Sequence, residues 1–170
     1  MTIRTRYTKN GTPYAEQAVA AFHQALELNP NYSLAWGTLG SVLAIAGDAE
    51  ESIKASQVAL RSNPGDPSNF FRFTSLAEAN YMLGRYEEAM DWARIAVNLK
   101  RDWFRGHHWV IGTLARLGRL EEARAAALVY LDLFPGGSLA DAERYPQKST
   151  AHRNQLLDDL RLAGLPTVPS

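Results

Sequence analysis

One segment recurs along this chain. It contains a Leu-Gly or Ala-Gly pair, two variable residues, a Glu-Glu pair and a small residue, and a proline follows later. Gly84 and Gly118 lie 34 residues apart, and Gly47 lies 37 residues before Gly84. Pro30 and Pro64 are again 34 residues apart. A fixed period in this range indicates a solenoid, in which each unit is one supersecondary element that buries its apolar face only against its neighbours. We therefore predict an all-α array.

Each unit of the repeat contains two helices separated by a glycine. In residues 31–64, apolar side chains recur at helical spacing from about 32 to 46 and again from about 49 to 61. Gly47 separates the two stretches, because glycine accepts the left-handed backbone that often ends a helix. The recurring Glu pairs fall at the start of each second helix, where carboxylates favour the helix dipole. Their position predicts a structural role and not acid–base chemistry.

The 37-residue step has a local explanation in the sequence. Asp66 and Pro67 are a capping residue and a proline of the kind that occupies the first helical position. We therefore expect the first helix of the unit 65–101 to begin early and to be one turn longer than its equivalents.

The C-terminal part of the chain lies outside the repeats. Residues 136–148 are expected to form a loop, residues 149–164 an amphipathic helix, and residues 165–170 a tail. A terminal repeat exposes an apolar face, so a solenoid needs a cap whose outer side is polar. Four leucines are expected on or near the inner face of this capping helix, namely Leu156, Leu157, Leu160 and Leu162. Its polar outer side would be formed by Arg153, Asp158, Asp159 and Arg161.

At the other end, residues 14–28 are expected to form the second helix of a first repeat. The first helix of that repeat, in residues 1–13, is partial or degenerate. The apolar face with Ala18, Ala21, Phe22 and Ala25 therefore lacks a partner. Exposed patches of a few hundred Å² tend to find partners, so we expect self-association through this end, or a lid made by residues 1–12.

The joint pattern resembles the tetratricopeptide repeat family. In the unit 31–64, the aromatic, Leu-Gly, small and proline positions of the family are filled by Trp36, Leu39, Gly40, Leu43, Ser52, Ala59 and Pro64. Two residues of the last unit depart from the pattern, His107 in the aromatic position and Tyr130 where a small residue is usual. The resemblance covers residues 14–135, as one second helix followed by the repeats 31–64, 65–101 and 102–135. It implies a right-handed superhelical α-solenoid, here ending in a C-terminal capping helix.

A second resemblance concerns the segments 63–67, 84–94 and 157–166. Together they are similar to the C-terminal repeat region that bacteria attach to nucleotide (adenylate or guanylate) cyclases and to winged-helix regulators. This resemblance implies a regulatory or structural appendage that packs on its own output domain or mediates oligomerisation. The sequence shows no cyclase catalytic segment and no DNA-binding helix-turn-helix.

Composition excludes several classes of function. The 18 basic residues balance the 18 acidic ones, so the chain has no overall attraction to nucleic acid or to anionic membranes. Cysteine is absent, which removes disulfides, zinc–thiolate sites and thiol nucleophiles. His107 and His108 lack the i,i+4 spacing of metal ligands on a helix, and no phosphate-binding glycine loop is present. We therefore expect a non-catalytic cytoplasmic protein without metal or cofactor.

In the tetratricopeptide repeat family, ligands lie along the first helix of each unit. Carried over by position, the resemblance implies a groove that binds a protein or peptide partner. It would be formed by Leu34, Ser41, Phe71, Thr74, Glu78, Tyr81, Arg105, His108 and Arg116. This series grades from apolar to aromatic to basic, which fits a peptide with an apolar stretch and an acidic end. The alternative is that Phe71 and Tyr81 only pack in the core.

Overall fold

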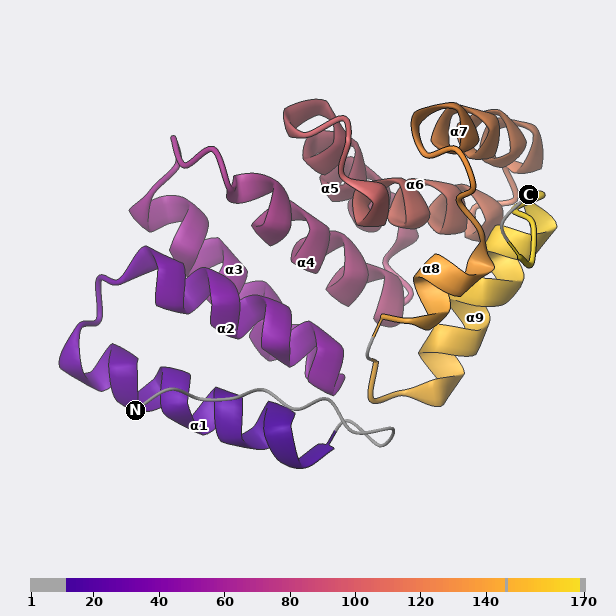
Figure 1. Cartoon of the computed structure of the whole chain (residues 1–170). Helices are drawn as coiled ribbons and strands as arrows, with labels where there is room; N and C mark the ends of the chain where they lie inside the picture. The colour runs from indigo at the N-terminus through magenta and orange to yellow at the C-terminus, as the bar shows by residue number, and fades with distance from the viewer. Residues whose placement is uncertain (1–11, 146, 169–170) are drawn as a thin grey trace.

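The computed structural model describes residues 12–145 and 147–168, and most of them are helical (Figure 1). Over these residues the chain forms no strand, so the predicted all-α class is confirmed. The helices are α1 (Thr12–Leu28), α2 (Ser33–Ala46), α3 (Ala49–Ser62), α4 (Asn69–Met82), α5 (Tyr86–Leu99), α6 (Phe104–Arg116), α7 (Leu120–Leu133), α8 (Leu139–Glu143) and α9 (Thr150–Leu162).

The repeats stack as two rows of helices. Each first helix contacts the second helix of its own unit, as α2 contacts α3 and α4 contacts α5. The first helices also contact one another, α2 with α4 and α4 with α6, and we call these three the inner row. Figure 1 shows the array turning gradually from α1 to α7, with α8 and α9 beside α6. The architecture is the α-solenoid that the repeat predicts.

Glycine ends the first helix of each repeat, as the sequence predicts. Gly47, Gly84 and Gly118 have φ values of 89°, 73° and 72°, in the left-handed region. A side chain would be strained there, whereas glycine adopts this conformation readily. These residues therefore fix the short turns between the two helices of each unit.

Two sequence-based expectations about connections are wrong. The helix after Asp66 is not longer than its equivalents, because α2 and α4 both have 14 residues. Extra residues lie instead in the turn 63–68, where the Asp66 carboxylate accepts hydrogen bonds from the backbone N–H and hydroxyl of Ser68. The segment 136–148, expected to be a loop, contains α8. That helix begins with a capping box in which Ser138 and Asp141 exchange hydrogen bonds with each other's backbone.

Small residues bring the two helices of a unit close together. The buried hydroxyl of Ser52 on α3 donates a 2.7 Å hydrogen bond to the carbonyl of Gly40 on α2. A Cβ atom at Gly40 would overlap the hydroxyl of Ser56 and lie 3.2 Å from the Ser52 carbonyl. The contact between α2 and α3 therefore requires glycine at this position.

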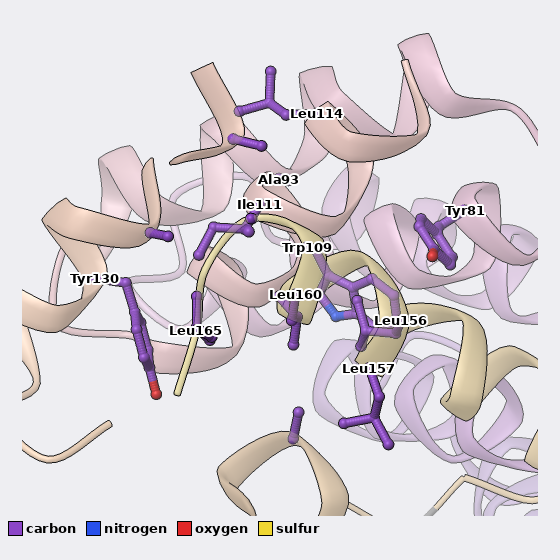
Figure 2. Close-up of a cluster of buried hydrophobic side chains, with 14 of the residues drawn as sticks. Tyr81, Ala93, Trp109, Ile111, Leu114, Tyr130, Leu156, Leu157, Leu160 and Leu165 are labelled. Carbon is purple, nitrogen blue, oxygen red and sulfur yellow. The ribbon is translucent and has the colours of Figure 1, made fainter. Parts of the chain in front are cut away.

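The core divides into two clusters of buried apolar side chains. A small one belongs to α1, α2 and α3 and includes Leu26, Leu39 and Leu43. The larger one runs from α4 to the C-terminal segment, and Figure 2 shows Leu156 and Leu160 of α9 among its members near Trp109. Helix α9 is thus part of the main core. Two expectations for this helix are wrong, because Leu162 is exposed and Asp159 is buried, where it accepts hydrogen bonds from Tyr81 and Arg116.

The expectation of a bare apolar face on α1 is wrong. Ala18 is buried, and Ala21, Phe22 and Ala25 are only partly exposed. The reason is that α1 packs against α2, where Phe22 joins the small core cluster. The predicted lid of residues 1–12 falls almost entirely outside the described residues. Self-association through this end stays a prediction.

Candidate partner-binding groove

One pocket opens on the inner row between α2 and α4. It has a volume of about 440 Å³, within the range of pockets that hold small ligands. Four of the predicted groove residues line it, namely Leu34, Ser41, Phe71 and Arg105. The other lining residues lie outside the nine predicted ones and are Gly37, Thr38, Val42, Ile45, Ser68, Arg72 and Tyr145; of these, Gly37 and Ile45 also hold groove positions of the family pattern. We call this hollow the groove pocket.

The groove pocket offers apolar surface to solvent. Leu34 is 53% exposed and Phe71 is 43% exposed, and both side chains line the same hollow. Phe71 is nevertheless held in place, because its ring packs 4.6 Å from that of Trp103, edge to face. Phe71 therefore packs against neighbouring rings and also leaves part of its own ring accessible, so its role in binding stays a prediction. Ile45 and Val42 extend the apolar wall along α2.

Arg72 forms the floor of the groove pocket and is only 3% exposed. Its guanidinium donates to the side-chain oxygen of Asn69 at 2.9 Å and pairs with Asp66 at 3.1 Å. A Cβ atom at Gly37 would lie 2.5 Å from Nε of Arg72, so the arginine fits only because position 37 is glycine. Since the charge of Arg72 is already paired, the pocket floor is close to neutral.

Four predicted groove residues, Glu78, Tyr81, Arg105 and Arg116, contact the chain's own C-terminal segment, residues 139–165. Glu78 is 1% exposed, and its two carboxylate oxygens have different partners. One accepts a 2.7 Å hydrogen bond from Arg105, and the other accepts a 2.9 Å bond from the Gln147 amide. Burial raises the pKa of Glu78, and both of these partners oppose that rise. The ring of Tyr145 lies 3.4 Å from the Arg105 guanidinium, a cation–π contact.

Tyr81 and Arg116 meet α9 at a single carboxylate. Asp159 accepts a short hydrogen bond from the Tyr81 hydroxyl and a 2.7 Å bond from Nε of Arg116. Burial raises the pKa of Tyr81, as does the negative charge of Asp159. Burial also raises the pKa of Asp159, although Arg116 opposes it. Tyr81 is thus a buried anchor for α9, and Arg116 is engaged within the molecule.

Thr74 and His108 are buried inside the array. The Thr74 hydroxyl donates to the Phe70 carbonyl and accepts a 2.9 Å hydrogen bond from the Trp103 indole. His108 lies beside the ring of Tyr130, and burial lowers its pKa to about 3. Its imidazole is therefore neutral at physiological pH. Like Glu78 and Tyr81, these two predicted groove residues are buried, so they stabilise the packing of the helices and offer no accessible surface to a partner.

The two departures from the repeat pattern also have a structural reason. His107 and Tyr130 are buried side by side near Phe134, and Nε2–H of His107 donates a 2.8 Å hydrogen bond to the Arg101 carbonyl. The large ring of Tyr130 reaches Gly137 and the α8 residue Asp141. A small residue would leave a void there, because α8 covers this end of the array in place of another repeat.

Helix α9 is a permanent part of the groove. Leu156, Leu157, Leu160 and Leu165 are each at most 7% exposed. Burying one leucine side chain is worth about 1.5–3 kcal/mol, so releasing all four would cost about 6–12 kcal/mol by the same measure. That is as large as the whole stability of many domains, roughly 5–15 kcal/mol. A partner therefore meets a groove whose α6 side is already filled.

One residue of α6, Gly112, could have indicated from sequence that α9 packs against this helix. A Cβ atom at Gly112 would be 2.6 Å from Cδ1 of Leu156, so the absence of a side chain makes room for α9. Gly112 sits in the middle of a helix, where glycine costs about 1 kcal/mol relative to alanine. A glycine at such a position indicates close approach of another element.

The residues that the structure describes contain no group of three or more His, Asp or Glu side chains placed to hold a metal ion. Within the same ranges, no helix is long and apolar enough to cross a membrane. What the geometry defines is an α-solenoid with a partly filled groove on its inner row.

Comparison with known proteins identifies the repeats. The tetratricopeptide repeat family matches residues 15–67. The solved structure of MamA from Desulfovibrio magneticus RS-1 has a TM-score of 0.66 at 16% identity, covering 89% of this chain and 80% of that one. YrrB, described as a TPR protein with an unusual peptide-binding site, has a TM-score of 0.61 at 22% identity, covering 88% and 81%. Residues 15–67 therefore match the tetratricopeptide repeat family, and the likeness to the solved structures shows that the described chain shares their fold.

Curated relatives share only part of their length with this chain. The STIP1 homolog of Dictyostelium discoideum is 34% identical over 86 residues, which is 50% of this chain and 15% of that protein. The peroxisomal targeting signal receptor of Kluyveromyces lactis is 37% identical over 76 residues, or 44% and 13%. The chain thus matches about one seventh of the length of these relatives.

Proposed function

We propose that this chain is a protein-interaction module that binds a peptide-like segment in the groove pocket. The observation that carries the proposal is the exposed apolar surface of Leu34 and Phe71 on the inner row, at the mouth of a 440 Å³ hollow. Contiguous exposed apolar surface beside polar groups is typical of interaction sites. Hydroxyls of Thr38 and Ser41 border this surface and can orient a bound backbone.

Similar proteins support the same class of function. The names of the curated relatives include a receptor for a targeting signal, and the YrrB structure is described with a peptide-binding site. The structure also narrows the expected ligand. Because Arg105 and Arg116 are paired with Glu78 and Asp159, the groove lacks the unpaired positive end that an acidic peptide would need. We therefore propose an apolar, uncharged anchor in the groove pocket.

The proposal that the chain is non-catalytic rests on the absence of an activated nucleophile, a phosphate loop or a ligand set in the sequence and in the described residues. The alternative function, an appendage of a nucleotide cyclase or winged-helix regulator, rests on resemblance alone. Nothing in the described residues favours it over the interaction module.

The test is selection of binders from a library of random dodecamer peptides, followed by fluorescence polarisation with the selected sequence. We expect a dissociation constant of roughly micromolar, equivalent to about −8 kcal/mol. Leu34→Ala should weaken binding about tenfold, because loss of one apolar anchor costs about 1–2 kcal/mol. Leu128→Ala is the matched control, since Leu128 is 69% exposed on α7 and does not line the groove pocket. Equal losses in both variants would place binding elsewhere.

A further inference from the structure

Three residues between α8 and α9 cross the whole inner row. The Tyr145 ring covers Arg105 of α6, and the Gln147 amide donates to Glu78 of α4. The backbone N–H of Lys148 donates a 2.9 Å hydrogen bond to the carbonyl of Ile45 at the end of α2. Within four positions of sequence, the chain thus contacts all three inner helices, which is how a bound peptide would lie on them.

We propose that Tyr145, Gln147 and the Lys148 backbone are an internal ligand of this groove, and that the partner fitting here is a peptide segment with an aromatic side chain followed two residues later by a carboxamide. This inference rests on the proposed function, because it treats the inner row as a peptide-binding surface. It adds the chemistry that a partner would have to present.

Each receiving group selects one feature of such a segment. The Arg105 guanidinium presents a planar cation, which attracts an aromatic face. The inner carboxylate oxygen of Glu78 already accepts from Arg105, so its second oxygen takes a donor such as an amide N–H and repels a carboxylate. The Ile45 carbonyl lies in the last turn of α2, where carbonyls lack an intrahelical partner and accept a backbone N–H from outside.

The internal ligand can be exchanged without unfolding the core. On its two sides, Leu139 of α8 and Leu156 of α9 are buried and stay fixed. Tyr145 and Gln147, by contrast, are only partly buried and act through polar and cation–π contacts. Tyr145 and Arg105 also line the groove pocket, so a peptide bound there lies next to the place that the internal ligand occupies.

The test uses a fluorescein-labelled peptide with the sequence of residues 143–149 and the full chain. In the double variant Tyr145→Ala/Gln147→Ala, Arg105 loses the tyrosine ring and Glu78 loses the amide donor, while the two residues stay paired with each other. We expect this variant to bind the peptide at least about tenfold more tightly than the unmodified chain, in which a tethered segment competes at an effective concentration near the millimolar range. The control is Arg144→Ala, a change in the same segment at an exposed side chain, which should match the unmodified chain.

Changes in the peptide keep the test independent of protein folding. Replacing its Tyr by Ala, or its Gln by Glu, should each reduce binding to the double variant about tenfold or more. If the double variant keeps its helical circular dichroism and binds no more tightly than the unmodified chain, the internal-ligand proposal is wrong. Binding that is indifferent to both peptide changes would also overturn it. Binding of the library-selected peptide, and its dependence on Leu34, is measured in parallel. That measurement tests the groove pocket, so the internal-ligand proposal can fail while the proposed function still holds.

Discussion

Replacing Leu160 by alanine tests whether α9 belongs to the core of the groove. Leu160 is fully buried in the main cluster, beside the region of Trp109 (Figure 2). Leucine-to-alanine changes at such sites cost about 2–5 kcal/mol, because transfer energy is lost and a cavity remains. A loss near 3 kcal/mol would lower the melting temperature of a chain of this length by about 6–12 °C. Urea unfolding followed by circular dichroism and tryptophan fluorescence measures the change.

Leu162→Ala provides the matched control for that experiment. Leu162 lies two residues further along α9 but is 53% exposed, so the same chemical change removes little buried surface. We expect its effect to stay within about 0.5 kcal/mol. If the two variants unfold at the same urea concentration, α9 does not pack against α6 as described, and the α6 side of the groove would be open to solvent.

Two further substitutions test the packing and the turn chemistry. Gly40→Ala should destabilise the chain by about 1–3 kcal/mol, since the added Cβ overlaps Ser56. The control Gly65→Ala should have little effect, because the space around Gly65 is open. Equal urea midpoints for the two variants would contradict this prediction. The hydrogen bonds from Ser68 lower the pKa of Asp66, so its charged form contributes stability above the unfolded pKa of about 3.9 and loses it as the pH falls through the lower folded pKa. Asp66→Asn should therefore be less stable than the unmodified chain at pH 7, with a gap that narrows below about pH 4; a gap of constant size in urea titrations across this range would refute the assignment.

The repeats could be predicted from sequence because the residues at each helix boundary determine where the helix ends. Glycines such as Gly47 and prolines such as Pro64 mark where each helix stops, and apolar spacing gives the helices between them. Short-range chemistry decides these features, so the observed α2 and α3 differ from the expected ranges by one residue. The extra turn residues near Asp66 were misplaced because a capping residue and an Asx-turn residue have the same local signature.

The filled half of the groove could not be predicted in the same way. Asp158 and Asp159 are equivalent in composition, yet Asp158 is exposed and Asp159 is buried against Tyr81 and Arg116. Which one faces inward depends on how α9 approaches α6, and that contact joins residues far apart in the chain. Glu78 carried a partial signal, because an acidic residue amid apolar and small neighbours on a packed helix needs a buried partner.

The return of the C-terminal segment onto the inner row changes how the array holds together. A simple solenoid is nearly one-dimensional, with each unit supported only by its neighbours. Here Tyr81 bonds to Asp159, 78 positions away, and Glu78 bonds to Gln147, 69 positions away. These links close α4 to α9 into one cooperative block around the larger core, while α1 to α3 depend on the smaller cluster. We therefore expect α1 to α3 to unfold at a lower denaturant concentration than the block from α4 to α9, and the groove pocket lies between the two parts.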